Sequence, residues 1–260
     1  MTTTVAGNER TDLHMTNLHV EVWGEGTPVV LVHGALATGA DEWSEQRPLA
    51  EHGLRLIVPD RRGYGQSPVA TGEDYLADAD DVVALMGAGA HLVAHSYGGL
   101  SAMIAAARRP EATLSLTLLE TPVRSVAEQD ADWRALIEQV TTVWHNQMSD
   151  AEWLVAFLGS VGSGDLPHGL LDAALPMVPV VRRGRPFFEA DLPLDELAAA
   201  TFPKLVVSGD HHRGFESMSD ALAQRIGASR AVVAGAGHEI QFTGAPINEA
   251  LLTLWRAAAS

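Results

Sequence analysis

The residues with the clearest chemical potential lie in "HLVAHSYGGL", residues 91–100, where a serine follows one pattern and precedes another. Leu92-Val93-Ala94 is typical of a buried strand, and the small-residue run from Gly98 is typical of a helix. Ser96 therefore falls at the joint, where its strained backbone requires small neighbours, and Ala94 and Gly98 are small. The pattern predicts a nucleophile elbow with the Ser96 hydroxyl at a helix N-terminus. The alternative is a serine in an ordinary strand–helix turn, which can have the same sequence pattern.

A serine hydroxyl becomes a nucleophile only beside a base, and imidazole is the side chain whose ordinary pKa suits that task near neutral pH. Of eleven histidines, only His238 lies after the last expected strand in a glycine-rich loop, "GAGHEIQF". His91 and His95 bracket an expected strand and are expected to be packed or rim residues. His238 is therefore the predicted base.

A third motif, "VVLVHGAL", places His33-Gly34 directly after an expected strand. Gly34 allows a sharp turn, so that the backbone amide of Ala35 can point at a bound carbonyl. Together with the amide of Tyr97 it would form an oxyanion hole, which stabilises the charge of a tetrahedral intermediate. The alternative is a histidine–glycine turn with no catalytic role, and His33 itself is expected to be structural.

Short, mostly continuous apolar runs alternate with helical stretches, which is typical of a parallel sheet covered on both faces. The expected strands are Val29–His33, Arg55–Pro59, His91–His95, Leu114–Glu120, Lys204–Ser208 and Arg230–Ala234. Ahead of them, Leu18, Val20 and Val22 alternate with polar residues, which predicts an antiparallel edge strand. The fold class is therefore α/β, with a doubly wound and mostly parallel sheet.

Residues 122–200 interrupt this rhythm, because they hold no clear strand and contain three of the six tryptophans. One helical face is expected to carry Trp133, Leu136, Ile137, Val140 and Trp144. Ser149 and Glu152 predict a capping box for the next helix, and "GSVGSGDLPHG" predicts a loop. We expect residues 122–200 to form a helical lid inserted between two parts of one core, residues 1–121 and 201–260.

The composition excludes several classes of function. Hydrophobic residues make up 47% of the chain and the net charge is −16, which disfavours nucleic acid or an anionic membrane as a partner. There is no cysteine, and the adjacent His211-His212 pair is expected to project apart, so no metal site is predicted. No signal peptide and no apolar stretch of membrane-spanning length are visible, and a cytoplasmic location with a frayed N-terminal tail is expected.

Taken together, "HGAL", "DRRGYGQS", "AHSYGG" and "GAGH" resemble the α/β-hydrolase fold family in identity and order. The resemblance implies Ser96 as nucleophile, His238 as base, and the amides of Ala35 and Tyr97 as oxyanion donors. It also implies that residues 60–63 form a structural turn and that no cofactor is required.

The position of the triad acid departs from the usual pattern. Many family members carry it in the loop after the strand that here reads "KLVVSGDHHRG", three residues beyond the glycine, but that position is His212. Two carboxylates remain, Asp210 in the same loop and Glu120 at the end of "LSLTLLE". The "E-x-P" setting of Glu120 is similar to that of lactonases that open zearalenone-type macrocycles, and this similarity favours Glu120 over Asp210.

The expected activity is hydrolysis of a carboxylic ester or lactone of an apolar small molecule through an acyl-enzyme. The expected substrate-binding residues are Trp133, Trp144, Trp153, Phe157, Phe187 and Phe188. The alternatives are a carbon–carbon bond hydrolase or cofactor-free oxygenase, a perhydrolase with the same triad, and a binding protein without turnover. The sequence makes no prediction of substrate identity or oligomeric state.

Overall fold

The computed structural model describes residues 16–163 and 168–258. The expected N-terminal tail and part of the "GSVGSGDLPHG" loop fall on residues 1–15 and 164–167, which lie outside the described residues.

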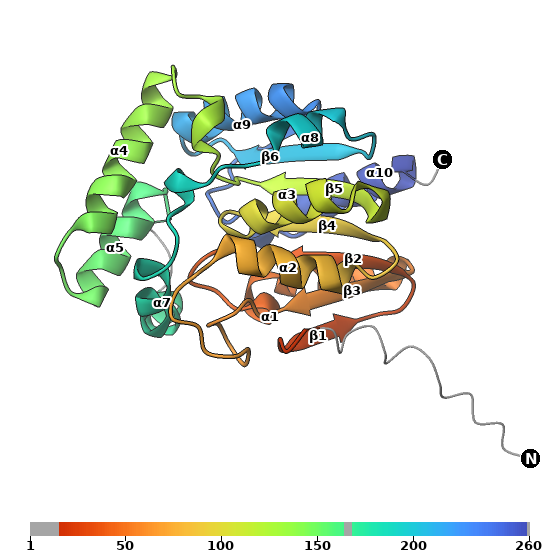
Figure 1. Cartoon of the computed structure of the whole chain (residues 1–260), viewed down its shortest axis with the longest axis horizontal. Helices are drawn as coiled ribbons and strands as arrows, with labels where there is room; N and C mark the ends of the chain where they lie inside the picture. The colour runs from red at the N-terminus through yellow and green to blue at the C-terminus, as the bar shows by residue number, and fades with distance from the viewer. Residues whose placement is uncertain (1–15, 164–167, 259–260) are drawn as a thin grey trace, which may run out of the picture.

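The described residues form a seven-stranded sheet in the order β1-β3-β2-β4-β5-β6-β7, as Figure 1 shows. The strands are β1 (Val20–Trp23), β2 (Thr27–Val32), β3 (Leu54–Pro59), β4 (Ala90–His95), β5 (Thr113–Leu119), β6 (Lys204–Gly209) and β7 (Ser229–Val233). Only β1, at the edge, is antiparallel to its neighbour, and every other pairing is parallel. The predicted α/β class, the edge strand and the six core strands are therefore confirmed to within a residue or two at their ends.

Helices cover both faces of this sheet. They are α1 (Gly39–Glu42), α2 (Tyr75–Met86), α3 (Gly98–Arg108), α8 (Leu194–Ala199), α9 (Arg213–Ile226) and α10 (Ala245–Ala258), with 3-10 helices η2 (Ser44–His52), η3 (Pro110–Ala112) and η7 (Ile240–Thr243). One face carries α2, α3, α8 and α9, and the other carries α1, η2, η7 and α10. No helix within residues 16–163 and 168–258 is long and apolar enough to cross a membrane.

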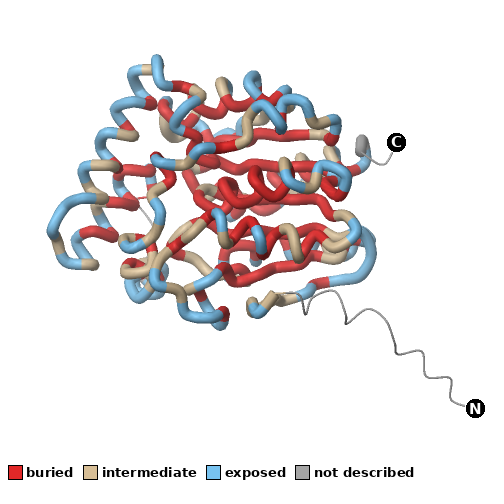
Figure 2. The backbone as a smooth tube through the Cα atoms, viewed as in Figure 1, coloured by how far each residue is buried: buried red, intermediate tan, exposed pale blue. Residues whose placement is uncertain are grey.

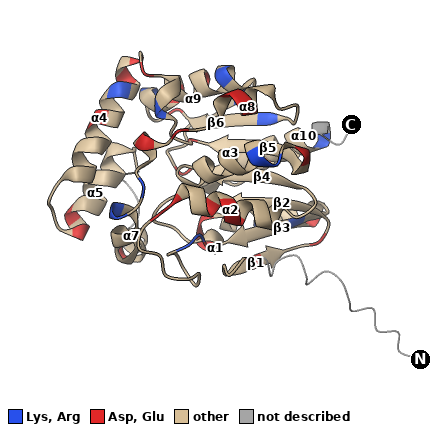
Figure 3. Ribbon diagram, viewed as in Figure 1, with Lys and Arg blue, Asp and Glu red and all other residues tan. Residues whose placement is uncertain are grey.

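Successive strand residues alternate between two apolar cores, because side chains of a strand point to opposite faces of the sheet. Val30 and Val32 of β2 lie in the core beneath α2 and α3, whereas Val29 and Leu31 lie in the core beneath η2 and α10. Figure 2 shows the strands and α3 as the most continuously buried segments, and Figure 3 shows most charged residues on helices and turns. The sheet is thus covered by helices on both of its faces.

The segment between β5 and β6 is helical, as predicted, and holds no strand among its described residues. Its elements are η4 (Arg124–Val126), α4 (Ala131–His145), α5 (Asp150–Ser160), α6 (His168–Ala174), η5 (Leu175–Met177), α7 (Val178–Arg182) and η6 (Phe187–Glu189), followed by α8. The predicted capping box of Ser149 and Glu152 starts α5. Figure 1 shows α4, α5 and α7 beyond one end of the sheet, whereas α8 packs against α3 and α9 on its face.

His91, on β4, generates a prediction about stability. Its Nδ1 lies 2.8 Å from the Ser115 hydroxyl and its ring packs against Trp255. Burial lowers the pKa of His91 from 6.5 to about 4, so between these values the unfolded chain binds more protons than the folded one. The free energy of unfolding should therefore fall as the pH is lowered from about 6.5 to 4, by an amount on the order of 2 kcal/mol from His91 alone.

His91→Asn, which cannot titrate in this range, should flatten that fall in urea-unfolding curves measured from pH 4 to pH 7. His52→Asn, which alters an exposed histidine of η2, is the matched control and should leave it unchanged. Equal slopes for wild type and His91→Asn would show that the buried imidazole does not carry this dependence.

Candidate active site

Ser96 occupies the turn between β4 and α3 in the strained conformation that the sequence predicts. Its φ is +47°, a left-handed value that is uncommon for residues with a side chain. A Cβ on Gly98 would lie 2.3 Å from the carbonyl oxygen of His33, so only glycine allows α3 to start this close to β2. The backbone amide of Ser96 donates to the carbonyl of Leu119 at 2.9 Å, which ties the turn to β5. Ser96 is thereby fixed at the carboxyl end of the sheet.

A hydrogen-bonded relay runs from Ser96 through His238 to Glu120. The Nε2 of His238 lies 3.1 Å from the Ser96 hydroxyl oxygen, and its Nδ1 lies 2.7 Å from Oε2 of Glu120. Because Nδ1 faces a carboxylate it carries the proton, which leaves Nε2 free to accept the serine proton. The three residues come from three different loops, and the fold brings all of them together.

Glu120 is fully buried and also has a left-handed backbone, with φ +40°. Its carboxylate accepts the backbone N–H of Gly209 at 2.9 Å and faces Nε2 of His211 at 2.9 and 3.1 Å. Burial by itself raises the pKa of Glu120, but the hydrogen bonds and charges of His211 and His238 outweigh it and lower the pKa to about 2. The carboxylate is therefore ionised at every pH at which a neutral imidazole can act as a base.

The alternative acid, Asp210, does not reach the relay. Its side chain is exposed at the surface and accepts the backbone N–H of Gly235 at 2.7 Å, so it stabilises a turn. His212, at the usual position of the family's acid, caps α9 by accepting the N–H of Gly214. The structure thus brings Glu120 and not Asp210 to His238, since the Asp210 carboxylate bonds to the Gly235 amide.

His211 is the residue of the relay that sequence reasoning missed. The adjacent pair does point apart, as expected, but His211 turns inward onto Glu120 while His212 caps a helix. The available signal was its place in the loop where many family members carry the acid, which marks a side chain within reach of His238.

Hydrogen bonds to the side chains of Glu42 and Arg61 hold the turn after β2. The Gly34 amide donates to Oε1 of Glu42 at 2.9 Å, and the carbonyls of His33 and Gly34 accept from the buried guanidinium of Arg61. His33 is structural, as predicted, because its Nε2 accepts the backbone N–H of Arg61. Leu36, in the same turn, also has a left-handed backbone, with φ +64°. Because the Arg61 side chain holds these backbone carbonyls, the prediction that residues 60–63 are structural is confirmed.

Ala35, Ser96 and Tyr97 line one cavity, and Tyr97 is the N-cap of α3. The N–H groups at a helix N-terminus that lack an acceptor can bind an anion, but in α3 those of Gly99 and Leu100 already bond to the carbonyls of Ser96 and Tyr97. The two residues whose amides the sequence predicts as oxyanion donors thus line the same cavity as Ser96.

His95 connects the turns around the cavity. Its Nδ1 lies 3.2 Å from Oε1 of Glu42, and its Nε2 lies 3.0 Å from the backbone carbonyl of His238. Burial lowers the pKa of His95, but the hydrogen bond to Glu42 and the negative charges of Glu42, Glu239 and Glu120 together outweigh burial, so the net shift is upward. A protonated His95 donates from both nitrogens and links the Gly34 turn to the His238 loop.

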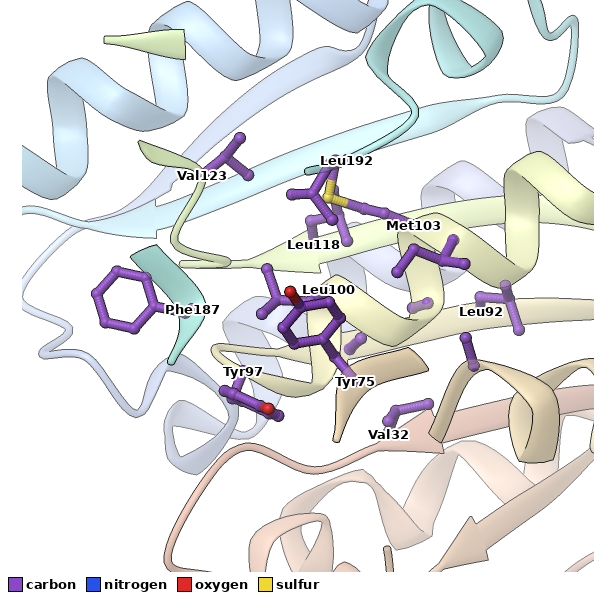
Figure 4. Close-up of a cluster of buried hydrophobic side chains, with 14 of the residues drawn as sticks. Val32, Tyr75, Leu92, Tyr97, Leu100, Met103, Leu118, Val123, Phe187 and Leu192 are labelled. Carbon is purple, nitrogen blue, oxygen red and sulfur yellow. The ribbon is translucent and has the colours of Figure 1, made fainter. Parts of the chain in front are cut away.

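Three of the six predicted substrate-binding aromatics, Trp144, Phe157 and Phe187, line the cavity. Other apolar lining residues, not named from the sequence, are Leu36, Leu158, Val161, Leu170, Met177, Val181, Phe215 and Phe242. Figure 4 shows Tyr97 and Phe187 at the same end of the buried cluster around α3, with Leu92 and Met103 at its other end. The inserted helices therefore supply much of an apolar cavity wall.

The other three aromatics do not line the cavity. Trp133 packs edge-on against Phe215 where α4 contacts α9, and Trp153 stacks on Phe157 with ring centroids 4.7 Å apart. Phe188 packs against Trp144 and is buried. These three rings pack against the core and against one another, and their assignment to substrate binding stays a prediction.

Glu120, His211 and His238 each present one nitrogen or oxygen atom within 4.8 Å of the others, a cluster that could hold a metal ion. In the geometry described here these atoms face one another in hydrogen bonds at 2.7–3.1 Å. In this arrangement the two imidazoles share one carboxylate through hydrogen bonds.

The sheet order, the elbow and the relay define an α/β hydrolase. The chain belongs to the alpha/beta hydrolase family, whose pattern matches residues 29–250. It is 30% identical over 233 residues to a pimeloyl-[acyl-carrier protein] methyl ester esterase of Aeromonas salmonicida, covering 84% of this chain and 90% of the relative. Over 83 residues, 30% of each chain, it is 43% identical to the non-heme chloroperoxidase CPO-A1 of Kitasatospora aureofaciens.

A solved structure of a thermophilic esterase from Thermogutta terrifontis superposes with a TM-score of 0.67 at 25% identity, covering 94% of both chains. The expected family membership and fold class are thereby confirmed.

The assignment of the acid is tested by labelling Ser96 with a reactive fluorophosphonate, which measures nucleophile activation without a known substrate. Glu120→Gln should slow labelling by about 10²–10⁴-fold, because an amide can neither fix the imidazole tautomer nor stabilise its cation. Asp210→Asn, the matched control, should stay within about threefold of wild type. The reverse ranking of the two variants would contradict the relay described above.

Proposed function

We propose that this protein is a serine hydrolase that cleaves a carboxylic ester or lactone of an apolar small molecule through an acyl-enzyme. The observation that carries the proposal is the relay of Ser96, His238 and Glu120 at the edge of an apolar cavity. The named activities of the esterases to which the chain is similar support the same class of bond.

In the proposed reaction His238 accepts the Ser96 proton through Nε2 while the serine oxygen attacks the ester carbonyl. The amides of Ala35 and Tyr97 donate to the oxyanion, and ionised Glu120 stabilises the imidazolium that forms. His238 then returns the proton to the leaving alcohol. A water molecule, deprotonated in turn by His238, releases the acid and restores the free serine. No step uses a cofactor.

The cavity lining supports a neutral, apolar substrate. Its walls are mostly aliphatic and aromatic, and its charged residues are Asp41, Glu42, Glu73 and Glu239, with no lysine or arginine among the described lining residues. An anionic acyl group would meet these carboxylates in a poorly hydrated site. A lactone remains within the proposed class, because the position of the acid resembles that of zearalenone-type lactonases.

Perhydrolysis is a second candidate, supported by the similarity to a chloroperoxidase over residues that make up less than a third of the chain. It would use the same acyl-enzyme, with hydrogen peroxide replacing water as the second nucleophile. Carbon–carbon bond hydrolysis, cofactor-free oxygenation and binding without turnover are alternatives that the following experiment separates.

A panel of p-nitrophenyl esters and macrocyclic lactones should be turned over by the wild type, and Ser96→Ala should lower turnover by about 10⁴–10⁶-fold. Melting temperatures of the two proteins control for folding. Activity retained after Ser96→Ala would favour carbon–carbon hydrolysis or oxygenation. A wild type that neither turns over the panel nor reacts with a fluorophosphonate would favour the binding protein.

The role of the inserted helices is tested by two neighbouring residues. Phe187 lines the cavity and Phe188 does not, although both are buried. Phe187→Leu should raise KM for a bulky ester such as p-nitrophenyl octanoate about three- to tenfold, because apolar contact area is lost, and should leave the acetate ester nearly unaffected. Phe188→Leu, the matched control, should lower the melting temperature without changing KM. If Phe187→Leu and Phe188→Leu changed KM equally, the result would contradict a specific contact between Phe187 and the acyl chain.

A further inference from the structure

Two imidazoles converge on the single carboxylate of Glu120. His238 Nδ1 lies 2.7 Å from Oε2, and His211 Nε2 lies 2.9 Å from Oε2 and 3.1 Å from Oε1. The N–H of Gly209 reaches Oε1 at 2.9 Å. The proposed reaction uses only His238, so His211 is a half-buried titratable group in the relay with no assigned role.

Apart from Glu120, two different parts of the molecule hold His211 in place. Its ring packs against Phe215 of α9, with centroids 5.8 Å apart, and Phe215 also packs against His238 at 4.8 Å. On the other side it meets Gly162, just beyond α5, where a Cβ would lie 2.4 Å from the His211 Nδ1. Gly162 has a left-handed backbone with φ +82° and leaves room for the imidazole. The ring therefore bridges the inserted segment and the relay.

A buried glutamate needs such a partner more than an aspartate would. Its carboxylate turns about three side-chain torsions, the last of which is broad, so one acceptor contact with His238 does not fix its plane. Apart from His211, the partners of the carboxylate are the Gly209 amide at Oε1 and His238 at Oε2. The Nε2–H of His211, placed between the two oxygens, stops rotation and directs Oε2 at His238.

We propose that His211 is a positioning residue, which donates from Nε2 to Glu120 and thereby holds the carboxylate in line with His238. This inference rests on the proposed function, because its consequence is the activation of Ser96. It also assigns a task to the loop after β6, whose carboxylate, Asp210, bonds to Gly235 and not to His238.

The experiment compares His211→Gln with His211→Met. The two replacements are similar in length, but only glutamine carries a side-chain N–H that can reach Glu120. The readouts are the rate constant for labelling of Ser96 by a fluorophosphonate, and kcat and KM for an ester from the panel. His212→Gln, which alters the neighbouring histidine, is the control.

His211→Met should slow labelling and lower kcat by about 10- to 100-fold, the range for losing one hydrogen bond to a charged group, with KM within about twofold. His211→Gln should stay within about threefold of wild type, as should His212→Gln. If His211→Met does not fold, judged by its melting curve, His211→Leu replaces it as the variant without a donor.

Equal rates for the glutamine and methionine variants would overturn the inference, whether both are fast or both are slow, because the donor would then be irrelevant. A wild type that is labelled at Ser96 confines such a failure to His211. A wild type that is not labelled at all would refute the proposed function, and the role of His211 with it.

Discussion

The site depends on backbone strain held at the carboxyl ends of three adjacent strands. Leu36, Ser96 and Glu120 are the residues other than glycine with positive φ in the described part of the chain, and they follow β2, β4 and β5. Each such conformation costs about 1–3 kcal/mol and persists only where its surroundings enforce it. Here the enforcing contacts are the ladder bonds of the central strands and the approach of Gly98 to the His33 carbonyl.

The same constraint explains how distant parts of the chain meet. In a parallel sheet every strand points the same way, so the loops after β2, β4, β5 and β6 emerge at one edge. Ser96 and Glu120 come from two of these loops, and His238 follows β7. Hydrogen bonds between loops then fix what the sheet brings near. The Ser96 amide bonds to the end of β5, and His95 bonds to the His238 loop.

Much of this arrangement could be predicted from the sequence, because it rests on local patterns. Apolar runs predict the strands, and small residues around Ser96 predict the elbow. Glu120 was favoured over Asp210 by a resemblance, and the structure supplies the physical reason, since Asp210 bonds to Gly235 at the surface. Of the six aromatics of residues 122–200 that the sequence predicts to bind substrate, three line the cavity. Helical periodicity places Trp133 and Phe157 on buried faces, but it does not tell whether a buried face meets the core or a cavity.

His211 was harder to predict, because its only signal in the sequence is its place in the loop where many family members carry the acid. Its proposed role depends on where the acid is, because a carboxylate at position 212, where many family members carry it, would leave no need for a second donor. In this chain Glu120 follows β5, and an N–H donor from the loop after β6 can support its carboxylate. The contact of His211 with Gly162 then links that carboxylate to the inserted helices, whose other residues line the cavity. In the proposed site the acid, Glu120, follows β5, and His211 couples the geometry of the relay to the inserted helices.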